Sequence, residues 1–193
     1  MAGVRQFDED LLLDQALAVF WQHGYSDTTM QQLAAATGVQ RGSLYNAYGD
    51  KETLFLRVFE RYRAYWVDTT RQLLAVPDAR QALDGFLALL IGSLTNETPA
   101  RSCMSTKTAM GPDIEDPVIR GALTGLLDAL EALFAQRLAT AAAELRLPPA
   151  QAARLFITAT RGLVVIERLY QDKTRLRQTA DSLLDAMFEP RQR

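Results

Sequence analysis

The sequence has little of the chemistry from which metal sites and disulfides are built. Among 193 residues it contains one cysteine, Cys103, and one histidine, His23. A single cysteine cannot form an internal disulfide, and this pair cannot supply a zinc site that needs several His and Cys ligands. No segment approaches the roughly 18 apolar residues that cross a bilayer, and residues 1–6 are too short and polar for a signal peptide. We therefore expect a soluble cytoplasmic protein with no metal, cofactor or membrane partner.

The overall composition is that of an ordinary folded protein. Hydrophobic residues make up 48% of the chain and charged residues 23%, and the formal net charge is −2. This mixture is far from the apolar-poor, highly charged composition of a disordered chain. At this length it predicts one or two compact domains with a substantial buried core.

Apolar residues recur at three- and four-residue steps along nearly the whole chain, which is the helical period, and no segment alternates like a strand. Capping and breaking residues predict nine helices. Three short ones come first, over residues 8–23, 30–36 and 40–47, and a long one follows over 50–75. The others are expected over 77–96, 101–110, 116–147, 149–172 and 174–188.

The predicted fold is therefore all-α. Residues 1–50 would form a three-helix module that contains a helix-turn-helix, and residues 51–193 would form a six-helix C-terminal domain. The long helix over 50–75 joins the two. A tight turn at Gly38 separates the second and third helices, and in a helix-turn-helix the second of the paired helices enters the DNA major groove.

The third helix carries residues suited to reading DNA. Arg41 can reach guanine edges and Asn46 can pair with adenine. Gly42 costs helix stability by roughly 1 kcal/mol relative to Ala, which suits a surface that approaches a large partner closely. Hydroxyl groups nearby can hold phosphates, and Lys51 adds a cation beside the exposed amides of the next helix start. The predicted DNA-contacting residues are Thr28, Thr29, Gln31, Arg41, Gly42, Ser43, Tyr45, Asn46 and Lys51.

The charge pattern of this region is mixed. Residues 1–63 contain eight acidic and six basic residues, so the region as a whole has no basic excess. Residues 28–49, however, contain no acidic residue at all. Negative charge is thus kept away from the expected DNA surface, and the small number of cations predicts modest nonspecific affinity and a dependence on dimerisation.

One long pattern in this region resembles the DNA-binding domain of the tetracycline-repressor (TetR) family of regulators. It covers the first third of the chain, and its matching positions are Phe20, Gly24, Tyr25, Thr28, Thr29, Leu33, Ala34, Gly38, Val39, Gly42, Ser43, Leu44, Tyr45, Tyr48, Gly49, Asp50, Lys51, Glu52 and Leu54. The resemblance implies an all-helical homodimer that binds a palindromic operator and an inducer. By motif position it assigns phosphate contacts to Thr28, Thr29, Tyr45 and Lys51 and groove-facing positions to Arg41, Gly42, Ser43 and Asn46.

The last two predicted helices carry seams of the kind that one helix presents to another in a bundle. These residues are Leu155, Ala159, Gly162, Ile166 and Leu169 on one helix, and Leu176, Ala180, Leu183 and Met187 on the other. Two copies could form a four-helix dimer interface from them, which would hold two recognition helices about 34 Å apart or a multiple of it. The alternative is that the seams fill the chain's own core.

The rest of the C-terminal region is rich in aromatic and methionine residues, which could line a cavity for a small apolar or aromatic effector. The candidates are Trp66, Phe86, Cys103, Met104, Met110, Phe134, Phe156 and Arg161. Core packing is the alternative for each aromatic residue and methionine. Arg161 and Glu167 could anchor a polar ligand group or form an ion pair across a dimer.

Cys103 is the one nucleophilic residue of the C-terminal region. Arg101, Lys107 and a helix start nearby would favour its thiolate, so an oxidant or electrophile sensor is conceivable, as is a small buried side chain.

Taken together, these patterns predict a ligand-responsive transcriptional repressor rather than an enzyme. A helical enzyme or small-molecule-binding protein that keeps the helix-turn-helix as scaffold is the alternative, although no phosphate loop or nucleophile elbow supports catalysis. A third possibility is an adaptor that binds another protein through its last helices.

Overall fold

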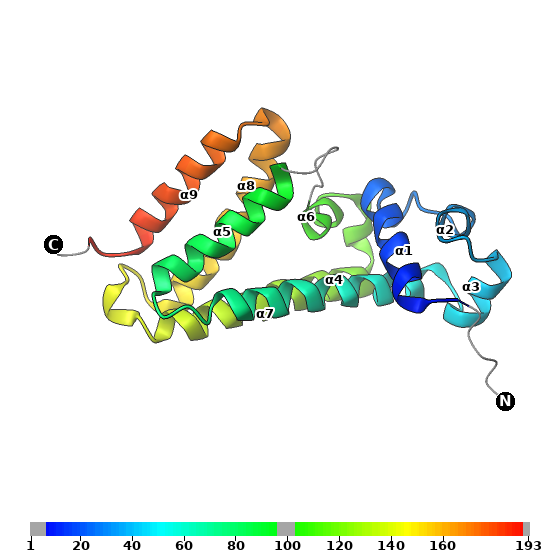
Figure 1. Cartoon of the computed structure of the whole chain (residues 1–193), viewed down its shortest axis with the longest axis horizontal. Coiled ribbons are helices and arrows are strands. Elements are labelled where there is room, and N and C mark those ends of the chain that lie inside the picture. The colour runs from blue at the N-terminus through cyan, green and yellow to red at the C-terminus, as the bar shows by residue number, and fades with distance from the viewer. Residues whose placement is uncertain (1–6, 96–102, 191–193) are drawn as a thin grey trace. The chain divides into compact units, whose positions relative to one another are not determined.

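The computed structural model describes residues 7–95 and 103–190 of the chain. Within these ranges the protein is helical, as predicted, with nine α-helices, two short 3-10 helices and one isolated bridge between Leu145 and Phe188 (Figure 1). The α-helices are α1 (Glu9–His23), α2 (Met30–Thr37), α3 (Arg41–Tyr48), α4 (Lys51–Leu73), α5 (Ala79–Thr95), α6 (Met104–Ala109), α7 (Pro117–Ala139), α8 (Pro149–Tyr170) and α9 (Lys173–Met187). The 3-10 helices are η1 (Pro112–Glu115) and η2 (Ala142–Glu144).

The first helices begin and end where their capping residues predict. Asp8 accepts the Leu11 N–H at 3.1 Å at the start of α1, and Gly24, with φ of +86°, ends that helix. At the start of α2 the Thr29 hydroxyl accepts the Gln32 N–H, and the Gln32 side chain accepts the Thr29 N–H at 2.8 Å. This is a reciprocal capping box, and it satisfies two of the amides that a helix start leaves unpaired.

The prediction that one helix continues from residue 116 to 147 is wrong. Helix α7 ends at Ala139, where the Thr140 hydroxyl turns back to accept from Arg137 and to donate to its carbonyl at 2.7 Å. A 3-10 turn follows, and the Arg146 N–H then donates to the Met187 carbonyl at 3.0 Å. The apolar residues after Ala139 continue the sequence pattern, but the backbone there pairs with the end of α9.

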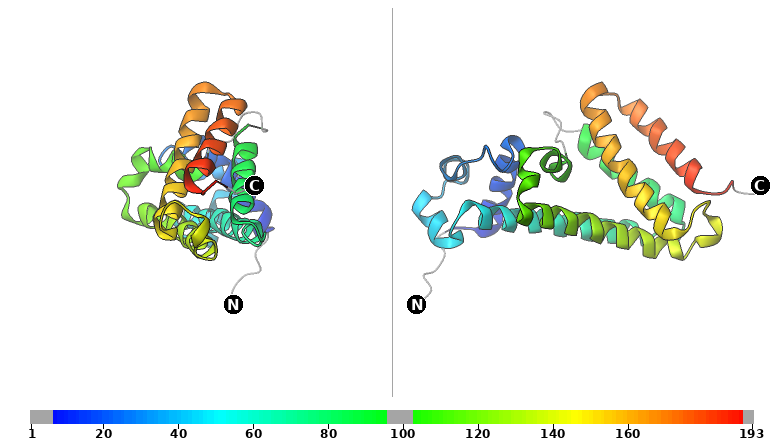
Figure 2. Two further views of the ribbon diagram at one scale, coloured as in Figure 1. Left: turned by 90° about the vertical axis from the view of Figure 1, so that its left-hand side faces the viewer. Right: turned by 180° about the vertical axis from the view of Figure 1, so that it is seen from behind.

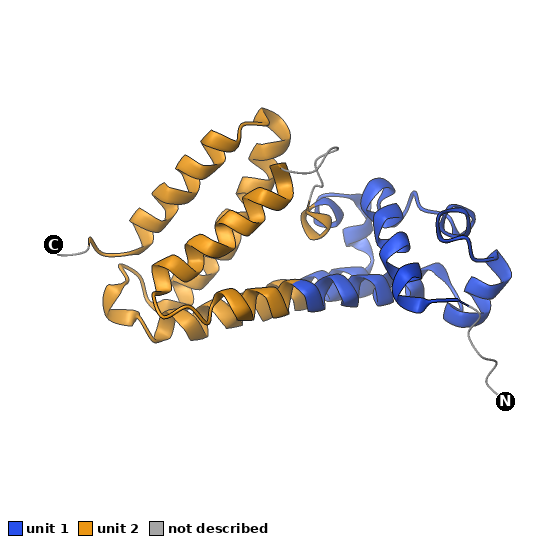
Figure 3. Ribbon diagram, viewed as in Figure 1, with its two compact units in different colours: residues 1–65, 107–123 blue, residues 66–106, 124–193 orange. Residues whose placement is uncertain are grey.

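The chain divides by contact into two compact units (Figure 3). Unit 1 comprises residues 1–65 and 107–123, and unit 2 comprises residues 66–106 and 124–193. The sequence suggested a single division after residue 50, whereas the contacts place the first half of α4 and a later segment, residues 107–123, with the helix-turn-helix. That segment has consequences for the site described below.

Unit 1 has an aromatic core between α1 and the first half of α4. Phe20, Phe55 and Phe59 are at most 1% exposed, and the rings of Phe20 and Phe55 meet edge to face at 5.2 Å between centroids. Such ring pairs add about 0.5–1.5 kcal/mol to the free energy gained by burying their area. This aromatic core therefore holds α1 against α4. Helix α2 packs on α1, and α3 packs on α2.

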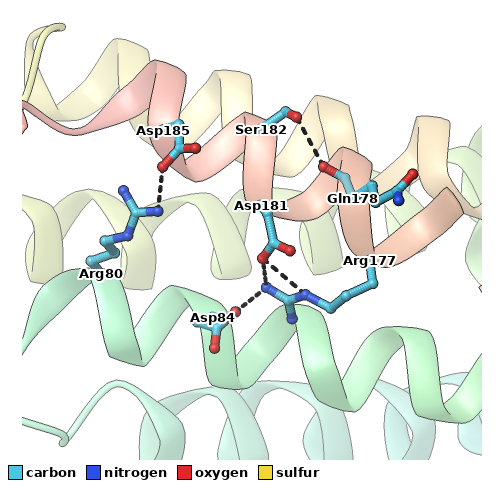
Figure 4. A network of polar contacts seen from close by, with 7 residues as sticks. All are labelled: Arg80, Asp84, Arg177, Gln178, Asp181, Ser182 and Asp185. Carbon is cyan, nitrogen blue, oxygen red and sulfur yellow. Dashed lines mark hydrogen bonds and ion pairs between the residues drawn. The ribbon is translucent and has the colours of Figure 1, made fainter. Parts of the chain in front are cut away.

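In unit 2, α9 packs against α5 and α8 (Figure 2). Ion pairs also join α5 to α9, as Figure 4 shows: Arg177 donates to Asp84 and Asp181, and Arg80 donates to Asp185 at 2.5 Å. The hydrogen bond from Arg177 lowers the pKa of Asp181 below its ordinary value. Because these groups are largely exposed, each pair contributes little to stability.

Candidate nucleic-acid interface

Helices α2 and α3 form the predicted helix-turn-helix. Gly38, with φ of +66°, occupies the left-handed conformation that lets the chain reverse between them, and a non-glycine residue there would be strained. Leu44 and Tyr48 bury the inner face of α3, with 0% and 5% of their surface exposed. The remaining face of α3 is therefore left without cover from the residues of its own module.

The outward face of α3 carries Arg41, Gly42, Tyr45 and Asn46, all of them exposed, while Ser43 is half-buried. This is the arrangement that the sequence predicts for a groove-reading helix. The Arg41 guanidinium donates to the Tyr45 hydroxyl at 3.3 Å and lies 5.4 Å from the centre of that ring. Tyr45 thus holds the Arg41 side chain along the exposed surface of α3, where the guanidinium remains available to a partner.

Gly42 has no packing role inside the chain. A Cβ atom built at this position would meet no other atom within 4 Å, and the backbone is helical. An alanine would fit and would favour the helix by about 1 kcal/mol. No contact among the described residues therefore requires a glycine here, and the close approach of a partner stays a prediction.

The residues at the start of α2 divide into one that is buried and two that are open. Thr29 and Gln31 are exposed beside the first turn of the helix. Thr28, in contrast, is 1% exposed and its hydroxyl donates to the Gly24 carbonyl at 2.5 Å. The prediction that Thr28 contacts a phosphate is wrong in this structure, because its hydroxyl is used inside the turn.

Lys51 also has a different role from the predicted one. Its ammonium donates to the carbonyls of Tyr25, Ser26 and Thr28 at 2.8, 3.3 and 2.9 Å and lies 4.3 Å from the centre of the Tyr25 ring. An ammonium has three donors, so these contacts use all of them. Lys51 joins the first turn of α4 to the turn between α1 and α2, which contradicts its assignment as a phosphate ligand.

Several acidic side chains of unit 1 are paired with arginines of α4. Arg61 donates to Asp10 at 2.5 Å and to Asp14 at 2.8 Å, and Arg63 donates to Glu60 at 2.9 Å. Asp50 caps α4, and the Thr53 N–H hydrogen bond lowers the pKa of its carboxyl group. Residues 28–49 contain no acid of their own, and Glu9 of α1 contacts α3 by accepting from the hydroxyl of the buried Tyr48 at 3.4 Å.

Sequence reasoning missed two residues that belong to this site. Asp113 in η1 accepts the Tyr25 and Ser26 N–H groups, and Lys107 in α6 donates to the last carbonyls of α1. Asp113 is only 7% exposed. No local pattern could have identified these contacts, because they join residues more than 80 positions apart.

The predicted dimer seam is open on α8 and closed on α9. On α8, Leu155 and Leu169 are 40% and 71% exposed. The other three seam residues of α8 are exposed or half-buried: Ala159, Gly162 and Ile166. A Cβ at Gly162 would meet nothing within 4 Å. This stripe lacks cover from the described residues of its own chain.

On α9 the seam prediction is wrong for three of its four residues. Leu176, Ala180 and Met187 are at most 1% exposed, because that face of α9 packs on α5 and α8 in the chain's own core. Only Leu183 is half-buried and so remains available to a second copy.

The predicted effector residues divide between core and surface. The rings of Trp66, Phe86, Phe134 and Phe156 gather in unit 2, with neighbouring centroids 4.7–6.1 Å apart. Each is at most 8% exposed. These rings pack against one another, which favours the core alternative. Met110 lies in unit 1 and is 68% exposed, so its assignment to a cavity with them is wrong.

Cys103 is buried immediately before α6, together with Met104. The Arg161 guanidinium donates to its sulfur at 3.3 Å and to the Ser105 hydroxyl at 3.1 Å. The cation beside the thiol is therefore Arg161 and not the predicted Lys107, while Arg101 lies outside the described residues. Arg161 has no carboxylate partner within residues 7–95 and 103–190.

Other kinds of site find no support in the described part of the chain. No group of three or more His, Cys, Asp or Glu residues is placed to hold a metal ion there. Over the same residues, no helix is long and apolar enough to span a membrane. Two open grooves of about 460 and 420 Å³ lie on the α5–α9 surface, lined by charged residues such as Arg80, and neither is bordered by the aromatic cluster.

Comparison with known proteins gives consistent matches. The family model described as bacterial regulatory proteins, tetR family, matches residues 12–58. The HTH-type transcriptional repressor ComR of Escherichia coli is 34% identical over 114 residues, which are 57% of this chain and 54% of ComR. The chain thus aligns with about half the length of this relative.

Solved structures match over nearly the whole chain. A cysteine mutant of the TetR family transcriptional regulator CifR, in complex with a 26-bp double-stranded operator DNA, has a TM-score of 0.83 and 26% identity, covering 95% of this chain and 99% of CifR. The reduced form of Escherichia coli NemR has a TM-score of 0.86 at 16% identity, covering 94% of this chain and 97% of that one. The latter likeness concerns the fold alone.

Proposed function

Because the chain belongs to the TetR family of bacterial regulatory proteins, we propose that it is a transcriptional repressor that binds a palindromic operator as a homodimer. The observation that carries this proposal is the open, acid-free face of α3, with Arg41 and Asn46 exposed around an unpacked Gly42. Base edges in the major groove are read by such side chains on a helix that leaves its backbone room to approach. Access to chromosomal DNA would place the protein in the cytoplasm, and the proposal assigns it no enzymatic reaction.

Dimerisation is proposed through the stripe on α8. The stripe runs through Leu155, Ala159, Gly162, Ile166 and Leu169, at steps of three and four residues. The small residues at its centre would let two α8 helices come close, and Leu183 of α9 would lie at the border. A symmetric dimer would present two α3 helices to successive major grooves and double the phosphate contacts of a module with few cations.

Release from DNA is proposed to follow effector binding in unit 2. The polar end of the site would be Arg161, whose guanidinium lies beside Cys103 and Ser105 and lacks a carboxylate partner in the described residues. A small molecule with an apolar or aromatic body and an anionic group would complement it, because a guanidinium pairs best with an oxyanion. Binding would shift a pre-existing equilibrium between two arrangements of the dimer.

A binding selection tests the function and identifies the operator in the same experiment. The purified chain is mixed with random-sequence duplexes, and the retained fragments are sequenced and then titrated against wild type and Arg41→Ala. We expect the selected duplexes to share a palindromic consensus. Arg41→Ala should lose about 1–3 kcal/mol of binding free energy and should no longer discriminate between bases at one position of each half-site. Recovery of no consensus, with equal affinity for unrelated DNA, would refute the proposal.

A further inference from the structure

The turn between α1 and α2 is held from outside the three DNA-binding helices by a buried carboxylate. The Tyr25 N–H donates to Asp113 Oδ2 at 2.9 Å, and the Ser26 N–H donates to Asp113 Oδ1 at 3.0 Å. The Ser26 hydroxyl also donates to Oδ1. Asp113 lies in η1, 88 positions after Tyr25, yet it belongs to the same compact unit. The Asp113 carboxylate therefore accepts from three donors of the α1–α2 turn, although Asp113 lies far from this turn in the sequence.

A second charged residue from the same segment binds the C-terminal end of α1. Lys107 donates to the carbonyls of Trp21 and Gln22 at 2.8 and 2.6 Å. These carbonyls are at the C-terminal end of α1, where the helix dipole favours a cation. In this segment, the Lys107 ammonium thus binds the carbonyls of the last turn of α1, and the Asp113 carboxylate binds the amides that follow. Each charge is opposite in sign to the partial charge of the backbone groups that it binds.

The turn is held from within by Thr28, whose hydroxyl donates to the Gly24 carbonyl at 2.5 Å and whose N–H donates to the Tyr25 carbonyl at 3.2 Å, and from outside by two charged side chains. Its carbonyls are bound by Lys51 of α4, and its Tyr25 and Ser26 amides are bound by Asp113. Gly24 opens the turn in a conformation that few residues other than glycine adopt, and Thr29 closes it as the cap of α2. Lys51 and Asp113 therefore add contacts from outside α1, α2 and α3 to the turn that joins α1 to α2, alongside the direct packing of α2 on α1.

We propose that Asp113 is a positioning residue for operator binding: its carboxylate sets the α1–α2 turn, and thereby the placement of α2 and α3 against DNA. This inference rests on the proposed function. Interfaces of this kind require the contacting groups to be held within about 0.5 Å by supporting residues. Removal of the carboxylate would leave the helices folded, because the core of Phe20 and Phe55 stays intact. It would, however, loosen the α1–α2 turn and so make the positions of α2 and α3 less well defined.

The test compares Asp113→Asn with Glu115→Gln, a charge-removing control on the same 3-10 helix whose side chain is 85% exposed. Binding is titrated against the selected operator duplex and against an unrelated duplex of equal length, at a temperature well below the unfolding midpoint of every variant. We expect Asp113→Asn to lose operator affinity roughly 5- to 100-fold, the usual range of coupling between sites, with unrelated-DNA affinity unchanged. Glu115→Gln should bind both like wild type.

A merely structural role would give a different result, because partial unfolding lowers affinity for both duplexes by the same factor. Ser26→Ala serves if Asp113→Asn does not fold, since it removes only the hydroxyl contact and should lose operator affinity about 2- to 10-fold, as the loss of one hydrogen bond allows. Unchanged operator affinity in either folded variant overturns the inference. Failure of the wild type to prefer the selected duplex refutes the proposed function instead, so the two failures are distinguishable.

Discussion

Replacing Lys51 by methionine distinguishes a structural ammonium from a DNA-contacting one. The substitution keeps an unbranched side chain as far as Cε, lacks the ammonium, and removes three hydrogen bonds of 2.8, 3.3 and 2.9 Å to carbonyls of the α1–α2 turn. A hydrogen bond from a charged donor contributes about 1.5–3 kcal/mol. Because Ser26 is exposed, water can replace the longest bond, so we count two bonds at the low end and expect a loss of about 3 kcal/mol in the free energy of unfolding.

For a chain of this length, that loss corresponds to a fall of about 6–12 °C in the unfolding midpoint. Circular dichroism at 222 nm during heating measures it. Arg41→Ala is the matched control, because it also removes a cation from unit 1, but from an exposed side chain. Its midpoint should remain within about 1 °C of wild type, as surface substitutions usually do.

The salt dependence of operator binding provides the refutation. A lysine that neutralises a phosphate contributes about 0.9 to the slope of log affinity against log salt concentration. Since the Lys51 ammonium is used within the turn, Lys51→Met should weaken binding and leave this slope unchanged. A slope reduced by about 0.9 per module, together with an unchanged unfolding midpoint, would show that Lys51 leaves the turn to contact DNA.

Three further predictions concern the α3 face, the α8 stripe and the α5–α9 ion pairs. Gly42→Ala should raise the free energy of unfolding by up to about 1 kcal/mol. It should also weaken operator binding at least about tenfold, because the added methyl group would displace one contact with DNA. Unaltered operator affinity would contradict the prediction that α3 approaches DNA closely at this position. Gly162→Leu should convert a dimer to a monomer in sedimentation velocity, because the side chain enters the proposed contact between α8 helices; a persisting dimer would place the interface elsewhere. Asp181→Asn should lower the unfolding midpoint slightly at neutral pH. The Arg177 hydrogen bond lowers the pKa of Asp181 from 3.8 in the folded chain, so its contribution is present above 3.8 and is lost as the pH falls from there through the lower folded-state pKa; a gap to wild type that does not narrow on acidification would contradict this assignment.

Much of the fold could be predicted because helix boundaries are encoded locally. Asp8, Thr29 and Asp116 cap the helices that their spacing indicates, and Gly24 ends α1. The α3 face was also predictable, since a helix of known period has only one orientation that buries both Leu44 and Tyr48. The end of α7 was not, because the apolar pattern continues beyond Ala139 and only pairing with α9 decides where the helix stops.

The amino-acid sequence by itself determined the helices, the turn at Gly38 and the acid-free surface of α3, because each depends on residues within a few positions of one another. Tertiary structure decided how the charged side chains are used. Lys51 and Asp113 have no neighbours in sequence that reveal their partners, and both bind backbone groups of the single turn between α1 and α2. Tertiary structure also decided which apolar seam is buried. The seam of α9 is buried and that of α8 is exposed, because other helices of the chain pack against the first and not against the second.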